Sequence, residues 1–89
     1  MINKKKNLKL AIIGLGYVGL PLALEFGKKK ITIGYDIDKK RVKSLISGID
    51  KNLEFDKNKL SSSKFLSYTN DIKDIKSSNF IVFKISLFK

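Results

Sequence analysis

Residues 10–21 read LAIIGLGYVGLP, an apolar run that leads into three glycines and a proline. Gly14, Gly16 and Gly19 have the spacing GxGxxG. Between a strand and a helix, this spacing is typical of a loop that binds the pyrophosphate of a dinucleotide. The preceding residues, MINKKKNLK (1–9), are basic, so a signal peptide or a membrane-facing segment is the alternative.

The apolar run does not have the features of an export signal. Glycines and Pro21 interrupt it, and Glu25 and Phe26 stand where a cleavage site of small residues would be expected. A run of about 15 residues is also short for a membrane span, which needs about 20. We therefore expect a cytoplasmic protein with no membrane partner.

The sequence around the glycines predicts a strand, a helix and a second strand. Residues 8–13, LKLAII, are apolar apart from Lys9 and end at Gly14, and residues 18–27 have helical periodicity with Pro21 in the first turn. Residues 31–36, ITIGYD, are rich in β-branched side chains and end in an acid.

The remaining chain continues this alternation. A helix capped by Asp38 and ending near Gly48 is predicted to bury one apolar face, which consists of Val42, Leu45, Ile46 and Ile49. The later predictions are a polar stretch over 50–64 with at most one helical turn, a strand over 65–69, a short helix carrying Ile72 and Ile75 and capped by Asn70 or Asp71, and a strand over 79–85.

Strands that alternate with helices predict a parallel sheet with helices on both faces. The expected class is α/β: a partial Rossmann fold of about four strands in the order 3-2-1-4. With 89 residues, the chain forms one domain at most.

Five residues of the glycine loop have expected roles. Gly14 permits the tight turn, Gly16 lets the backbone approach a pyrophosphate, and Gly19 lets the helix pack against the strand. The N–H groups of Tyr17 and Val18 open the helix and face the anion. The alternatives are a turn without a ligand and, for Tyr17, a side chain that only packs.

Asp36 lies 20 residues after Gly16, at the end of the second predicted strand. A carboxylate at this position accepts hydrogen bonds from the adenosine ribose and repels a 2′-phosphate, which favours NAD over NADP. Arg41, one helical turn further, is placed to reach the same ribose or a phosphate. The alternatives are a solvated acid at a strand end for Asp36 and a surface cation for Arg41.

The composition excludes several kinds of site. The chain has no Cys and no His, so it holds no thiolate nucleophile, imidazole base or zinc site of these ligands. The net charge of +11 raises nucleic acid as a partner. Only Arg41 is an arginine, and the lysines are spread along the chain, which is typical of A/T-rich coding. We therefore expect no specific nucleic-acid binding, no metal site and no catalytic residue.

Three segments resemble the UDP-glucose/GDP-mannose dehydrogenase family of NAD-dependent nucleotide-sugar 6-dehydrogenases. AIIGLGYVGLPLALEFGKK (11–29) is similar to the start of its cofactor domain, and GYDIDKKRVKSLISGID (34–50) to the second strand and helix. KNLEF (51–55) and LSYTNDIKDIKSSNFIV (66–82) are most similar to the branch that acts on UDP-N-acetylhexosamines, as in Vi-type polysaccharide biosynthesis.

The resemblance implies NAD as cofactor, with Gly14, Gly16, Tyr17, Val18 and Gly19 at the pyrophosphate. It also implies Asp36 at the ribose and Arg41 on the adenosine side. Family members oxidise the C6 alcohol of a UDP-sugar to a carboxylate with a cysteine that lies far downstream of this region.

The chain departs from the family pattern after Val82. A Thr- and Pro-containing run is expected there, but the sequence reads FKISLFK (83–89), with Lys84 inside a predicted strand. This pattern suggests a frame change followed by an early stop. We therefore expect residues 1–89 to be the N-terminal part of the NAD-binding domain, without a substrate domain, inactive alone and without the family's homo-oligomer. The alternatives are a stand-alone dinucleotide-binding module and a basic protein that binds nucleic acid non-specifically.

Overall fold

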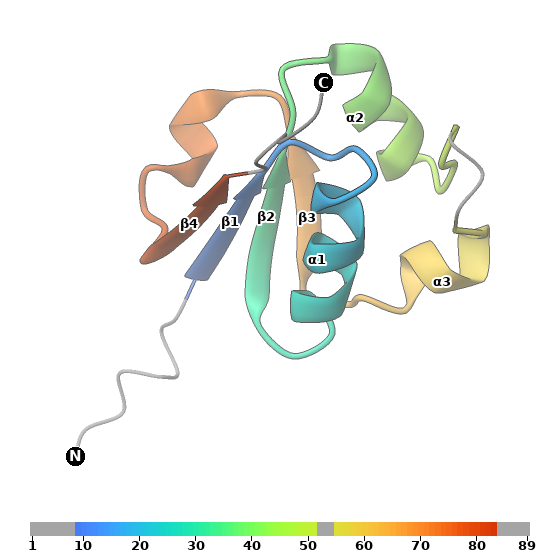
Figure 1. The fold of residues 1–89 in the computed structure, drawn as a ribbon, viewed down its shortest axis with the longest axis horizontal. Coiled ribbons are helices and arrows are strands. Elements are labelled where there is room, and N and C mark those ends of the chain that lie inside the picture. The colour runs from blue at the N-terminus through green and yellow to red at the C-terminus, as the bar shows by residue number, and fades with distance from the viewer. Residues whose placement is uncertain (1–8, 52–54, 84–89) are drawn as a thin grey trace.

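The computed structural model describes residues 9–51 and 55–83 (Figure 1). The strands are β1 (Lys9–Ile13), β2 (Ile31–Tyr35), β3 (Leu66–Thr69) and β4 (Phe80–Phe83). The helices are α1 (Gly19–Phe26), α2 (Lys39–Ile46), α3 (Lys57–Ser61) and a 3-10 helix, η2 (Ile72–Ile75). The predicted strand ends at Leu8, Lys84 and Ile85 lie outside the described residues.

The four strands form one parallel sheet in the order β3-β2-β1-β4. This order is the one that the alternation of strands and helices predicts, and the α/β class is confirmed. Ile13 at the end of β1 pairs with Tyr35 at the end of β2. The loops after these two strands therefore leave the same edge of the sheet side by side.

Helices lie on both sides of the sheet. The connections from β1 to β2 and from β2 to β3 step in the same direction, so right-handed crossovers place α1 and α2 on one face. The connection from β3 to β4 steps back across the sheet, which places η2 on the opposite face. Figure 1 shows α1 and α2 together on one side and the orange turn of η2 on the other.

The core lies between the sheet and the helices α1 and α2. Its buried cluster consists of Ile12, Leu15, Leu20, Ala23, Leu24, Leu45 and Leu60. Leu15 belongs to the glycine loop, yet its side chain is fully buried. The loop is therefore anchored in the core by its own side chain.

The predicted apolar face of α2 is only partly correct. Val42 and Leu45 are buried, but Ile46 and Ile49 are 65% and 55% exposed. The helix ends at Ile46, and Gly48 follows with a φ of 85°, so Ile49 does not lie on the helix at all. Around the helix, Leu45 and Ile46 flank Val42 on opposite sides. The buried stripe includes Leu45, and Ile46 lies at its margin.

The helix caps agree with the sequence interpretation. The Asp38 side chain accepts hydrogen bonds from the N–H groups of Lys40 and Arg41 at the start of α2. Asp71, one of the two predicted caps, accepts from Lys73 N–H at the start of η2. Each carboxylate binds N–H groups that lack a partner within their helix.

Candidate functional site

Two of the three loop glycines are required by the geometry of the loop. Gly14 has a φ of 97°, a conformation that L side chains rarely adopt. A Cβ on Gly19 would lie 1.5 Å from the carbonyl oxygen of Gly14, so the start of α1 touches the turn directly. The φ of Gly16 is not positive, and its backbone conformation does not by itself require glycine.

The amides at the start of α1 are available as donors. Within the part of the chain that the structure describes, the N–H groups of Gly16, Tyr17, Val18 and Gly19 have no hydrogen-bond acceptor, and Val18 provides no side-chain cap. The first bond of this turn is donated by Leu20 N–H to the carbonyl of Gly16. Unpaired N–H groups at a helix start bind anions such as phosphate.

The side chains at the tip of the loop point away from the core. Tyr17 is 67% exposed and Val18 is 52% exposed. Packing against the described residues therefore does not explain Tyr17.

Asp36 is joined to the glycine loop by a direct hydrogen bond. Its Oδ2 accepts from Leu15 N–H at 2.8 Å, and its Oδ1 accepts from Asp38 N–H at 2.9 Å. Each carboxylate oxygen has two lone pairs, so Asp36 keeps acceptor capacity for a further donor. The predicted pyrophosphate loop and the predicted ribose acid are therefore held side by side.

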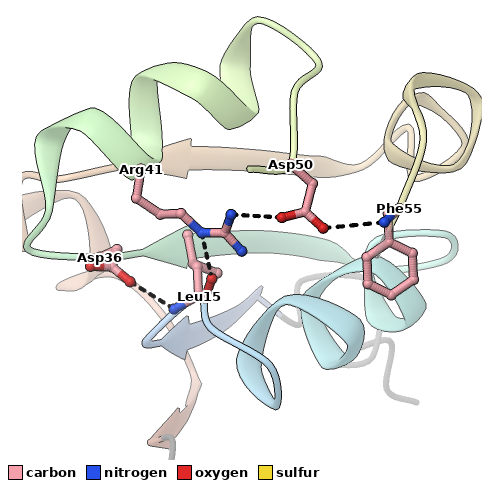
Figure 2. Close-up of polar contacts among 5 residues, drawn as sticks. All are labelled: Leu15, Asp36, Arg41, Asp50 and Phe55. Carbon is pink, nitrogen blue, oxygen red and sulfur yellow. Dashed lines mark hydrogen bonds and ion pairs between the residues drawn. The ribbon is translucent and has the colours of Figure 1, made fainter. Parts of the chain in front are cut away.

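Arg41 is turned inward, as Figure 2 shows. Its Nε donates to the carbonyl of Leu15 at 2.7 Å, and its Nη1 forms an ion pair with Asp50 Oδ1 at 2.7 Å. The side chain of Arg41 is 11% exposed and that of Asp50 is 1% exposed. Arg41 is therefore not a surface cation.

Leu15 and Asp50 complete the site, and the sequence interpretation missed both. Leu15 donates its N–H to Asp36, and its carbonyl accepts from Arg41. The peptide groups before and after its Cα are therefore both held by hydrogen bonds. Asp50 also accepts from Phe55 N–H at 3.2 Å. The only signal was an acid nine residues after the single arginine, in a stretch that looked like a polar loop.

A separate hollow of about 610 Å³ lies between α2, α3 and β3. Leu45, Leu60, Leu66 and Tyr68 line it, together with the stem of Lys57. None of the seven predicted site residues contributes to its wall. The glycine loop and Asp36 instead lie at the carboxyl edge of the sheet, the usual ligand position in open parallel sheets.

Tyr68 on β3 buries its hydroxyl without a partner among the described residues. Burial raises the pKa of Tyr68 from 10.0 to about 12; the positive charge of Arg41 opposes this effect and the negative charge of Asp50 adds to it. The pKa of Tyr68 is thus higher in the folded state than in the unfolded state, so a neutral phenol favours folding. The stability that depends on this neutral phenol is complete below pH 10.0 and is lost as the pH rises through about 12.

We expect Tyr68→Phe to stabilise the fold by up to about 1 kcal/mol at pH 7, because it removes a buried hydroxyl that has no partner. The advantage of the variant should grow between pH 10 and 12, because the phenol of unfolded wild type ionises in this range while the buried phenol stays neutral. Urea denaturation at pH 7, 9.5 and 11.5 measures both effects. Tyr17→Phe, which removes an exposed phenol, is the control at pH 7. A difference between wild type and Tyr68→Phe that stays constant with pH contradicts the interpretation.

Residues 8–86 match the UDP-glucose/GDP-mannose dehydrogenase family, NAD binding domain. The chain belongs to this family. The family match confirms the resemblance inferred from GLGYVGLP (14–21), and with it a Rossmann domain that takes NAD as cofactor.

The relatives support the UDP-N-acetylhexosamine branch of the family. The chain is 47% identical to UDP-N-acetyl-D-glucosamine 6-dehydrogenase of Salmonella typhi, over 89% of this chain and 19% of that protein. It is 40% identical to Protein CapL of Staphylococcus aureus, over 89% of this chain and 18% of that protein. The chain thus spans about a fifth of the length of the curated relatives that it matches.

Solved structures agree with this assignment. The UDP-D-ManNAc dehydrogenase of Pyrococcus horikoshii superposes with a TM-score of 0.81 at 30% identity, over 88% of this chain and 20% of that one. The UDP-N-acetyl-mannosamine dehydrogenase Cap5O of Staphylococcus aureus gives 0.70 at 26% identity, over 86% and 19%.

Among residues 9–51 and 55–83, no helix has the length and apolarity that a bilayer crossing requires. Nor do three His, Cys, Asp or Glu side chains gather in these ranges as a metal site would require.

Proposed function

We propose that this chain binds NAD at the carboxyl edge of β1 and β2. The amides from Gly16 to Gly19 take the pyrophosphate, the turn at Gly14 gives it room, and the carboxylate of Asp36 takes the adenosine ribose. The hydrogen bond from Leu15 N–H to Asp36 Oδ2 carries the proposal most directly. It fixes the phosphate-binding turn and the ribose acceptor relative to each other before any ligand arrives.

The residues present fit the cofactor. Unpaired amides at the start of α1 suit a pyrophosphate, and a carboxylate with spare lone pairs suits a ribose diol. NAD supplies the hydride acceptor in enzymes that oxidise alcohols. The described residues bind and orient the cofactor, and we assign none of them a catalytic role.

We further propose that this binding serves oxidation of the C6 alcohol of a UDP-N-acetylhexosamine to a uronate. The names of the relatives support this substrate class. The sequence of 89 residues contains no cysteine, so the covalent step expected from the family resemblance cannot be carried by this chain. Its contribution is cofactor binding, and a UDP-sugar would bind only with the remainder of an intact enzyme.

Titration with NAD and with NADP tests the first proposal. We expect measurable binding of NAD and binding of NADP that is weaker by about tenfold or more, because Asp36 repels a 2′-phosphate. Isothermal calorimetry on the 89-residue chain measures both dissociation constants. Absence of NAD binding by a chain with a cooperative thermal unfolding transition would contradict the proposal.

Gly16→Val tests the position of the pyrophosphate. The new side chain occupies the space through which the backbone would approach the phosphates, so we expect NAD affinity to fall by about 30-fold or more. The fold should persist, because Gly16 has no positive φ. Ser61→Val places the same side chain on exposed α3 and should leave the affinity unchanged. If Gly16→Val binds NAD like the wild type, the pyrophosphate lies elsewhere.

A further inference from the structure

Opposite charges approach the same residue of the glycine loop from two sides. Asp36 accepts from the N–H of Leu15, and Arg41 donates to its carbonyl. Yet the ion pair that Arg41 makes within the described residues is with Asp50, and none is made with Asp36. The guanidinium is thus drawn away from the acid that would face a ribose.

Asp50 is well placed to hold Arg41 in this position. Its side chain is 1% exposed, its Oδ1 lies 2.7 Å from Arg41 Nη1, and its Oδ2 accepts from Phe55 N–H. The backbone amide restrains the carboxylate, and the carboxylate restrains the guanidinium. Arg41 is consequently buried, with only 11% of its side chain exposed.

Loss of the charge on Asp50 would leave a buried guanidinium without its counter-ion, which is strongly unfavourable. Arg41 has two ways to relieve this: it can turn toward Asp36, or it can bind an external anion near the same loop. In dinucleotide-binding folds, an arginine close to the ribose site accommodates the 2′-phosphate of NADP. Either movement would weaken the repulsion by which Asp36 rejects NADP.

We infer that Asp50 determines cofactor specificity: by holding Arg41 inside the fold, it preserves the preference for NAD over NADP. This inference rests on the proposed NAD site. Asp50 binds Arg41 and is itself held by Phe55 N–H, so it acts as a positioning residue through Arg41. Arg41 is the only arginine of the chain, so no other guanidinium can take its place.

Asp50→Asn tests the inference through the ratio of the dissociation constants for NADP and NAD. We expect this ratio to fall by about tenfold or more, mainly because NADP binds better. Glu25→Gln removes one negative charge from an exposed position of α1 and should leave the ratio unchanged. The double variant Arg41→Met and Asp50→Asn lacks the released cation, so its NADP to NAD ratio should be higher than that of Asp50→Asn alone. Asp50→Ser removes the same charge with a smaller side chain, should Asp50→Asn not fold.

The ratio separates the two proposals. Suppose that the wild type binds NAD, but Asp50→Asn and Glu25→Gln give the same ratio of dissociation constants for NADP and NAD. This result overturns the inference and leaves the proposed function intact. A wild-type chain that binds neither dinucleotide overturns the proposed function, and the specificity role falls with it. A general loss of stability in a variant would lower its affinity for NAD and for NADP alike and leave the ratio of the two dissociation constants unchanged.

The Nε–H resonance of Arg41 gives an independent readout by NMR without any ligand. It is unambiguous because the chain has one arginine. We expect a resolved signal that exchanges slowly with water in the wild type and in Glu25→Gln, since Nε donates to the buried loop carbonyl. In Asp50→Asn the signal should exchange at least about tenfold faster. Unchanged protection in Asp50→Asn would show that Asp50 does not hold Arg41, and would overturn the inference.

Discussion

Gly19→Ala is expected to remove a large part of the stability of this chain. The added Cβ would lie 1.5 Å from the carbonyl oxygen and 2.7 Å from the carbonyl carbon of Gly14. Both are backbone atoms of the turn, and they cannot move without separating α1 from β1. We expect a loss of more than about 4 kcal/mol, at the extreme of single substitutions. A domain of this size has a total stability of only about 4–13 kcal/mol.

Gly16→Ala is the matched control, because it makes the same substitution two residues after the turn in the same motif. Gly16 does not have a positive φ, so we expect a change of at most about 1 kcal/mol. Circular dichroism during thermal unfolding compares the two variants with the wild type. A cooperative transition for Gly19→Ala within a few degrees of that for Gly16→Ala would show that α1 can withdraw from the turn.

The glycine loop was predictable from sequence because its constraints are local. A strand, a turn with fixed glycine spacing and a helix start follow one another within residues 9–26, and each has a clear pattern. The position of Asp36 was predictable for a related reason, since it directly follows the neighbouring parallel strand β2. The spacing of residues in the sequence could not show that the glycine loop and the end of β2 touch. The hydrogen bond between Leu15 and Asp36 shows this contact.

The partner of Arg41 was not predictable, because the pairing depends on how the chain turns after α2. Asp50 lies beyond the positive-φ residue Gly48, in a stretch whose composition is that of a solvated loop. Nothing in the local sequence shows that this turn brings a carboxylate back to Arg41. For the same reason Ile49 was assigned to a helix face that ends three residues earlier. The direct contact of Arg41 with NAD remains a prediction.

Arg41→Met is expected to destabilise the fold by about 3–5 kcal/mol, the usual cost of removing one member of a buried ion pair. Asp50 would keep its charge in a site where the whole residue is only 3% exposed. The carbonyl of Leu15 would also lose the donor that now lies 2.7 Å away. Urea denaturation measures the free energy of unfolding, and Lys39→Met, on the exposed start of the same helix, should change it by less than about 0.5 kcal/mol.

The double variant Arg41→Met and Asp50→Asn distinguishes charge burial from lost packing. It also removes the buried negative charge of Asp50, so it should be more stable than Arg41→Met alone, although it contains one more substitution. Recovery of stability on neutralising Asp50 indicates an uncompensated buried charge, whereas packing losses alone would accumulate. If the two losses simply add, the ion pair contributes little, and the position of Arg41 is set by its bond to Leu15 and by the packing of its stem.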